Sequence, residues 1–153
     1  MKCALLIGIA LMFPAMPALS QAPEELTKDR ILAAGPQWQE KYEQYDPPAE
    51  TLELLKSRLA GLKIDVYLGL WCPDSRNNLP PFIKILDRLA AGVPVRYFGV
   101  PRKPSRDVKY YVVDMAVERV PSFIFYRDGK EIGRIIENPK TGMVEDFMDI
   151  VCK

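Results

Sequence analysis

The alternation of apolar and polar positions predicts a chain that passes repeatedly between strand and helix. The apolar run Ile64–Leu70 indicates a strand buried on both faces, and Leu79–Ala91 has the apolar spacing of a helix. We expect this helix to begin with a turn near Pro73 and to bend near Pro80, because proline removes a helical hydrogen bond. A second strand is expected at Val93–Val100.

The C-terminal part has the pattern of a hairpin followed by a helix. Two apolar segments, Ser122–Tyr126 and Glu131–Ile136, flank Asp128-Gly129, a dipeptide typical of tight hairpin turns. The spacing also favours a short helix at Arg106–Met115. Together these elements predict an α/β fold, a three-layer sandwich with a mixed sheet between helices on both faces. Thr141 begins the final helix, with Met143, Phe147, Ile150 and Val151 apolar.

Residues 23–48 are an extension rich in charged and aromatic side chains, ahead of the main domain at 49–153. Trp38, Tyr42 and Tyr45 are spaced by four and three, which places them on one face of a short helix. That helix either packs on the domain, the more ordinary arrangement, or offers its face to a partner. The next helix is expected at 49–62, with a stripe formed by Leu52, Leu55, Leu59 and Leu62.

Residues 1–22 have the pattern of a secretory signal peptide. Lys2 is followed by an apolar run from Ala4 to Phe13, and small residues around Ala22 suit cleavage. The apolar run is too short for a membrane-spanning helix. We therefore expect an exported protein, periplasmic or secreted, that has no membrane partner once the signal is removed.

Charge gives little support for several classes of partner. The chain has 21 basic and 20 acidic side chains, and Lys2 is the only charge within 1–22. The remaining chain is therefore neutral, which does not favour nucleic acid or an anionic membrane. The loop Pro101–Arg106 is basic; it either holds an anionic ligand or is simply solvated.

The cysteine and histidine counts narrow the chemistry further. There is no histidine, which excludes Ser-His and Cys-His catalysis, histidine metal sites and histidine haem ligation. Cys3 is expected to leave with the signal, so Cys72 and Cys152 remain. Two cysteines without histidine do not make a structural zinc site, and no metal or cofactor is expected. In an exported protein these thiols can form disulfides.

Cys72 is the strongest candidate for chemistry. It follows a predicted strand and precedes a predicted helix. Unpaired N–H groups and the positive end of the helix dipole at such a junction favour the thiolate over the thiol. Pro73 is expected to fix the turn. Asp74 either caps the helix or opposes the thiolate with its own charge.

At this point the sequence resembles the thioredoxin superfamily, over roughly 49–151. The resemblance depends on four features in register: Trp71-Cys72 at a strand end, Pro80 eight residues later, Val120-Pro121, and the hairpin residue Gly129. The pattern from Gly69 to Ser75 is also similar to a subgroup of exported bacterial thioredoxin-like proteins with a Trp-Cys-x-Asp-Ser motif.

The resemblance implies which residues meet a substrate. Val120-Pro121 would be a cis peptide facing Cys72, and the Val120 backbone would pair with a substrate chain; the alternative is an ordinary trans proline at a strand start. Trp71, Pro73, Asp74, Val120 and Pro121 would then be substrate-binding residues, and Cys72 and Ser75 catalytic ones.

Two departures from the family pattern concern the same step. Ser75 occupies the position of the second cysteine, so its hydroxyl can hydrogen-bond the sulfur at Cys72 but cannot form a disulfide. Val66 occupies the position of a buried carboxylate, and alternation in a strand turns the neighbouring Asp65 to the opposite face. In the resembled family, the second cysteine and the buried carboxylate both serve the step in which a thiol of the same chain releases the substrate from a mixed disulfide. This chain has neither group at those positions.

Cys152 is not expected to replace the missing thiol. In the resembled fold the final helix runs away from the site, which places Cys152 roughly 15 Å farther off, whereas a disulfide needs Cα atoms within about 7 Å. We therefore predict no Cys72–Cys152 disulfide within one molecule. Cys152 either links two copies into a dimer or stays free.

Two functions from different classes follow. The first is a monothiol thiol-disulfide oxidoreductase that forms mixed disulfides at Cys72 with a cysteine-containing protein or a low-molecular-weight thiol. The second is a non-catalytic binding module that keeps the fold and its substrate surface. Other chemistry at Cys72, such as peroxide sensing, is a third and lesser alternative.

Overall fold

The computed structural model describes residues 22–90, 92–103 and 109–153. The predicted signal peptide therefore lies almost entirely outside the described residues, as does the start of the helix expected at 106–115. No helix in the described ranges is long and apolar enough to cross a membrane.

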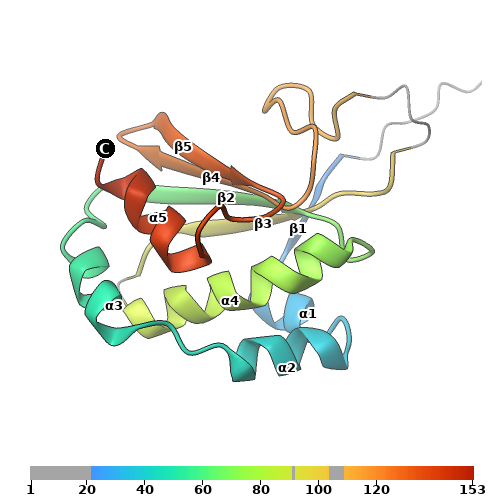
Figure 1. Cartoon of the computed structure of the whole chain (residues 1–153). Coiled ribbons are helices and arrows are strands. Elements are labelled where there is room, and N and C mark those ends of the chain that lie inside the picture. The colour runs from blue at the N-terminus through green and yellow to red at the C-terminus, as the bar shows by residue number, and fades with distance from the viewer. Residues whose placement is uncertain (1–21, 91, 104–108) are drawn as a thin grey trace, which may run out of the picture.

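The described residues contain a five-stranded mixed sheet in the order β1-β3-β2-β4-β5 (Figure 1). The central pair, β2 and β3, is parallel, and every other neighbouring pair is antiparallel. A mixed sheet of this kind was predicted from the alternation of elements. Its strands are β1 (Glu24–Leu26), β2 (Leu62–Leu68), β3 (Val95–Gly99), β4 (Ser122–Arg127) and β5 (Lys130–Ile136).

The hairpin between β4 and β5 is confirmed. Asp128 and Gly129 both have positive φ, at 51° and 79°, which is the backbone that a tight two-residue hairpin turn requires. The strands extend one residue farther into the turn than predicted, to Arg127 and from Lys130.

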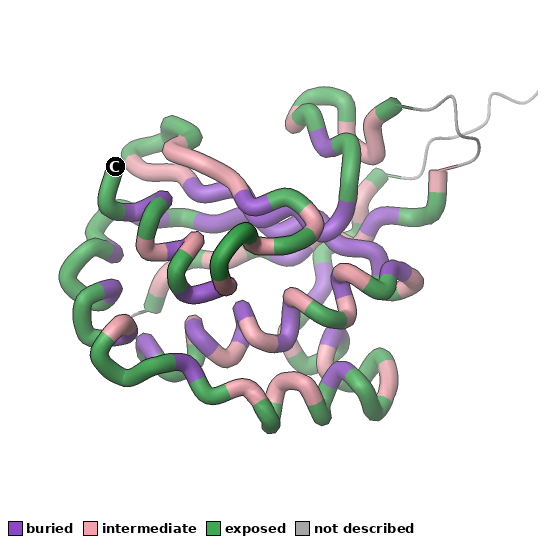
Figure 2. Tube along the Cα trace, viewed as in Figure 1, coloured by how far each residue is buried: buried purple, intermediate pink, exposed green. Residues whose placement is uncertain are grey.

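The helices gather on one face of the sheet, where they share one core (Figures 1 and 2). Side chains at Ile64 and Val66 of β2 are fully buried against them. The opposite face has no helix in the described part of the chain, so the expected cover on both faces is observed on one face only. The helices are α1 (Lys28–Leu32), α2 (Pro36–Gln44), α3 (Ala49–Lys56), α4 (Pro73–Leu89) and α5 (Met143–Val151).

Helix α4 begins at Pro73, as predicted, and runs continuously through Pro80 and Pro81 to Leu89. Its inner side packs on the sheet through fully buried Phe82 and Ile83, which follow the two prolines. The helix ends because Ala90 adopts a left-handed conformation, with φ of 47°. The apolar spacing had predicted a helix through Ala91, two residues farther than its end at Leu89.

The helix expected at 49–62 is shorter than its apolar stripe. It ends at Lys56, and Gly61, with φ of 69°, leads directly into β2 at Leu62. Leu62 is only 2% exposed, but it is buried as a strand residue. The prediction of one helix was therefore too long, because its apolar stripe continues from α3 through a loop into the start of β2.

The helix expected at 106–115 is wrong over its described part, residues 109–115. Val112 and Val117 form an isolated antiparallel bridge, in which the Val117 N–H donates to the Val112 oxygen at 3.0 Å. Ala116 turns the chain with φ of 51°. Because Val117 is fully buried, this segment folds back over the sheet instead of continuing as a helix.

The extension at 23–48 packs on the domain. Trp38 is 3% exposed within the main core, and the Tyr42 hydroxyl donates to Asp87 of α4 at 2.6 Å. Lys28 also contacts Asp87, at 3.1 Å. The extension additionally contains β1, a strand that was not predicted and that pairs with β3 at the edge of the sheet.

Tyr42→Phe tests how firmly the extension is attached. We expect the free energy of unfolding to fall by about 1 kcal/mol, because one hydrogen bond to a partly exposed carboxylate is lost. The hydrogen bond to Asp87 raises the pKa of Tyr42 to about 12. The decrease in the free energy of unfolding caused by Tyr42→Phe should therefore have its full size below the ordinary tyrosine pKa of about 10. It should become smaller as the pH rises toward 12.

Urea unfolding at pH 8 and pH 11 measures this difference. Tyr45→Phe is the matched control, since Tyr45 packs on the same core and no hydrogen bond to its hydroxyl is present among the described residues. Equal losses for the two variants at pH 8 would contradict the role of the Tyr42 hydrogen bond.

Candidate functional site

Cys72 lies at the junction predicted for it, between the end of β2 and the first turn of α4. It is the residue that caps the helix N-terminus, with an extended backbone, and its carbonyl accepts from the Arg76 N–H at 3.1 Å. The helix that follows has 17 residues, so its N-terminal partial charge is fully developed. The positive end of the helix dipole therefore lies beside Cys72.

The sulfur is held against the loop that precedes β4. The Val120–Pro121 peptide is cis, and the Cys72 thiol donates to the Val120 carbonyl oxygen at 3.2 Å. Cys72 is 7% exposed and packs in a small cluster with Val100, Val117 and Val120. The structure thus brings Cys72 together with Val120 and Pro121, although Val120 follows Cys72 by 48 residues in the chain.

Ser75 is fully buried and has a structural contact. Its oxygen accepts a hydrogen bond from the Gly69 N–H at 3.2 Å, which ties the end of β2 to the first turn of α4. The expected hydrogen bond between Ser75 and the sulfur of Cys72 is not among the hydrogen bonds of the described residues. Ser75 therefore fixes the geometry of the turn that carries Cys72.

Trp71 forms one wall of the site. Its indole N–H donates to the Val100 carbonyl at 3.0 Å, and its ring lies against Gly69, where an added Cβ would meet it at 2.7 Å. The rings of Trp71 and Tyr111 are 5.9 Å apart, and the Arg102 guanidinium lies 4.7 Å from the Trp71 ring. Trp71 is thus locked in place on several sides.

Tyr111 and Arg102 were not predicted as site residues. Burial, followed by the charge of Cys72, raises the pKa of Tyr111, whereas the Arg102 cation lowers it. The phenol therefore lies within electrostatic reach of both the sulfur and the guanidinium. Only the basic character of the loop 101–106 could have signalled Arg102, and Tyr111 lay in a segment that was assigned to a helix.

The remaining residues considered in the sequence lie in the first turn of α4, in the core, or on the sheet face opposite the helices. Pro73 occupies the first turn of α4, where its missing N–H leaves no bond unmade. Asp74 lies in the same turn, and no hydrogen bond caps the helix through its side chain. Val66 is fully buried in the core, while Asp65 lies on the opposite face in a bidentate pair with Arg96, as alternation predicts.

Cys152 lies far from this site in the fold. It follows α5 at the C-terminal end of the chain, which Figure 1 shows at the other end of the sheet from the start of α4. Cys152 is exposed and contacts the Met148 sulfur at 3.4 Å, and both Cys72 and Cys152 are free thiols. In the described part of the chain, no group of three or more acidic or cysteine side chains is arranged to hold a metal ion.

The mixed sheet with its covering helices, together with a cysteine at the start of α4, defines a thioredoxin-fold domain. A family model described as Thioredoxin matches residues 22–149. The chain therefore belongs to the thioredoxin family. The match includes the whole extension at 23–48 and nearly all of the segment on which the sequence resemblance depended.

Solved structures show a similar fold at low identity. PA1234, a protein of unknown function from Pseudomonas aeruginosa, has a TM-score of 0.53 and 18% identity, covering 80% of this chain and 82% of that one. Thioredoxin from Fasciola hepatica has a TM-score of 0.43 and 22% identity, covering 66% and 89%. Thioredoxin from Aeropyrum pernix has a TM-score of 0.41 and 20% identity, covering 65% and 82%. No curated protein matches the chain.

Ser75→Ala tests the structural role of the serine. The substitution leaves the buried Gly69 N–H without a partner, so we expect the free energy of unfolding to fall by about 1–3 kcal/mol. Urea unfolding measures the loss. Ser57→Ala is the control, because the Ser57 hydroxyl bonds an exposed carbonyl, that of Leu54, and its removal should change stability by less than about 0.5 kcal/mol. An unchanged free energy of unfolding in Ser75→Ala would show that the turn does not need this hydrogen bond.

Proposed function

We propose that this protein is an exported monothiol thiol-disulfide oxidoreductase acting through mixed disulfides at Cys72. The observation that carries the proposal is the position of the sulfur. It lies at the N-terminus of α4 and 3.2 Å from the Val120 oxygen, next to the Val120–Pro121 peptide. Membership in the thioredoxin family supports the general chemistry.

The exchange proceeds in two balanced steps. The Cys72 thiolate attacks one sulfur of a substrate disulfide, so that a new S–S bond forms, the old one breaks, and the departing thiolate takes up a proton. An external thiol, or the second cysteine of the substrate, then attacks the mixed disulfide as its thiolate and releases Cys72. Ser75 cannot perform this second step because a hydroxyl forms no disulfide.

The residues around Cys72 suit these steps in different ways. The positive end of α4 stabilises the thiolate both as the attacking and as the departing group. The Val120 carbonyl accepts from the thiol before ionisation. Trp71 and Tyr111 supply aromatic surface beside the sulfur for the substrate. Thiol–disulfide exchange requires no metal or organic cofactor, because the substrate disulfide is the oxidant and the external thiol is the reductant.

The partners follow from the same chemistry. A cysteine-containing protein or a low-molecular-weight thiol would react at Cys72, in the periplasm or outside the cell if residues 1–22 direct export. The neutral chain outside 1–22 argues against nucleic acid and membrane surfaces as partners. The exposed Cys152 would permit a disulfide-linked dimer under oxidising conditions.

A second function is supported by the burial of the sulfur. Cys72 is 7% exposed, Ser75 is bonded to backbone, and Val66 replaces a carboxylate within an apolar core. A non-catalytic binding module would need the Trp71 and Pro121 surface but no reactive thiol. The two functions differ in whether Cys72 reacts.

Alkylation of Cys72 at pH 6.5 distinguishes them. We expect iodoacetamide to modify Cys72 at least about tenfold faster than Cys152, with the difference narrowing toward pH 9, because only the thiolate reacts. Cys152 is a suitable internal control, since it is exposed and lies at the negative end of α5. Peptide mass mapping separates the two sites.

Equal or slower modification of Cys72 at pH 6.5 would exclude an activated nucleophile and favour the binding module. Incubation with glutathione disulfide provides the complementary measurement. A Cys72 adduct that added glutathione removes is the expected result, and Cys72→Ser should abolish it while Cys152→Ser leaves it intact.

A further inference from the structure

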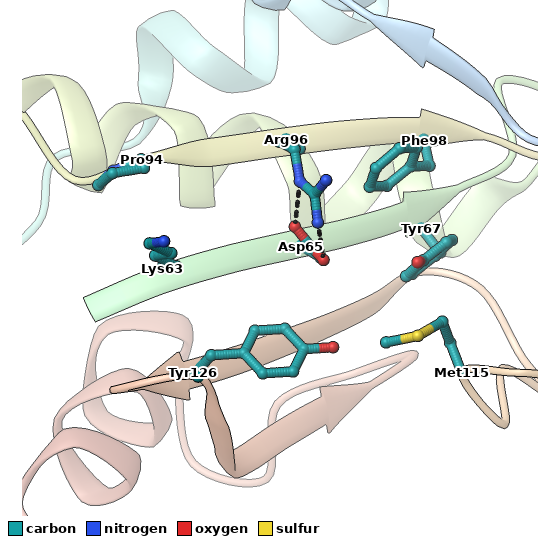
Figure 3. A pocket seen from close by; sticks show the side chains of 9 residues that line it. Lys63, Asp65, Tyr67, Pro94, Arg96, Phe98, Met115 and Tyr126 are labelled. Carbon is teal, nitrogen blue, oxygen red and sulfur yellow. Dashed lines mark hydrogen bonds and ion pairs between the residues drawn. The ribbon is translucent and has the colours of Figure 1, made fainter. Parts of the chain in front are cut away.

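The sheet face opposite the helices contains a hollow that the thiol chemistry does not use. Figure 3 shows it, lined by side chains of β2, β3 and β4 that point away from the helical core. Its volume is about 660 Å³, within the range of about 300–1,000 Å³ that small-molecule sites occupy. In the described part of the chain no helix covers this face.

The lining of the hollow is largely aromatic. The rings of Tyr67 and Phe98, from adjacent parallel strands, stack at 5.0 Å with only 19° between their planes. Tyr126, on β4, lies across β2 from Phe98, and Met115 from the folded-back segment borders the far side (Figure 3). The outer sides of the stacked pair leave aromatic surface against which another ring can pack.

The polar groups that face the hollow are biased toward hydrogen-bond donors. Both carboxylate oxygens of Asp65 already accept from Arg96, at 2.8 and 2.7 Å, and its side chain is 9% exposed. Arg96 remains 60% exposed, and its Nη1 makes no hydrogen bond with the described residues. Lys63 lies on the same strand as Asp65 and also lines the hollow. The charge offered to a ligand is therefore positive.

The Tyr126 ring also lines the hollow, but its hydroxyl oxygen is not open to it. That oxygen is buried, and no hydrogen bond to it exists among the described residues. Burial of an unpaired hydroxyl costs about 1–3 kcal/mol, so Tyr126 is a strained but apolar part of the lining. Burial, followed by the charge of Asp65, raises the pKa of Tyr126 to about 12, so the phenol keeps its proton at neutral pH.

We propose that this hollow binds a small planar aromatic anion, a carboxylate or sulfonate. The ring would pack against the stacked Tyr67–Phe98 pair, and the acidic group would accept from Arg96 and Lys63. Charge complementarity selects this occupant, because an uncharged ring would leave the donors unpaired and a cation would face two positive side chains. The site is independent of Cys72 and of the function proposed for it.

The matched dyes 8-anilinonaphthalene-1-sulfonate and N-phenyl-1-naphthylamine test this with the full chain. The two differ only in the sulfonate group, and fluorescence titration measures both affinities. We expect the anionic dye to bind one molecule per chain at this site at least about tenfold more tightly than the neutral one. Equal affinities would reveal a general apolar patch and overturn the proposal, as would the absence of binding.

Variants locate the binding. Lys63→Gln should weaken the sulfonate dye about threefold or more, whereas the neutral dye should change little. Arg96→Gln combined with Asp65→Asn removes both charges of the ion pair. In this double variant the ratio of the affinities for the sulfonate dye and the neutral dye should fall toward one. The controls are Arg88→Gln and Tyr45→Phe, on the helical side.

Stability measurements keep the test decisive. Lys63→Gln should leave the melting temperature of the free protein nearly unchanged while weakening the dye, because Lys63 is an exposed residue of β2. Sulfonate binding that none of the hollow variants alters would place the dye elsewhere, for instance on the apolar segment 4–13, and would contradict the site. A stable dimer whose dye binding appears only on dissociation would show that a second copy covers the face, which also overturns it.

Discussion

The hydrogen bond from the Gly69 N–H to the Ser75 oxygen is the constraint on which the site depends. It joins the end of β2 to the first turn of α4, and Cys72 lies between its two ends. Gly69 also leaves room for the Trp71 ring, which a Cβ would meet at 2.7 Å. One buried contact therefore fixes the direction of the helix, the position of the sulfur and the wall beside it.

This contact changes how the serine in the motif is understood. A residue that is fully buried and bonded to backbone has a structural purpose even where the family's second thiol is missing. The apolar environment of Val66 is consistent with that arrangement, since a carboxylate there would be buried among hydrocarbon without a proton to relay. Ser75 and Val66 are thus both buried structural residues of this chain.

The sequence predicted those features that depend on local periodicity. The Asp128-Gly129 hairpin, the start of α4 at Pro73 and the outward direction of Asp65 follow from turn chemistry and from alternation along a strand. The thioredoxin resemblance, which required features distributed along the chain, was confirmed by the family match.

Features decided by tertiary contacts were not predicted. Strand β1 has only three residues, two of them glutamates, and exists because it pairs with β3. The segment around Val112 has helical spacing but folds back because Val117 is buried against the sheet. For the same reason Tyr111 and Arg102 emerged as neighbours of Trp71 only in the structure. Short-range patterns cannot report which of two competing burial arrangements the whole chain selects.

The one-sided placement of the helices has a thermodynamic consequence. With α1 to α5 all on one face, no helix in the described part of the chain covers the aromatic face of β2, β3 and β4, and the segment around Val117 folds back over part of it. Any molecule that occupies this face in the native state alone shifts the folding equilibrium by mass action, and it does so in proportion to the logarithm of its concentration. The resistance of this protein to heat and proteolysis would then vary with the solutes of its compartment.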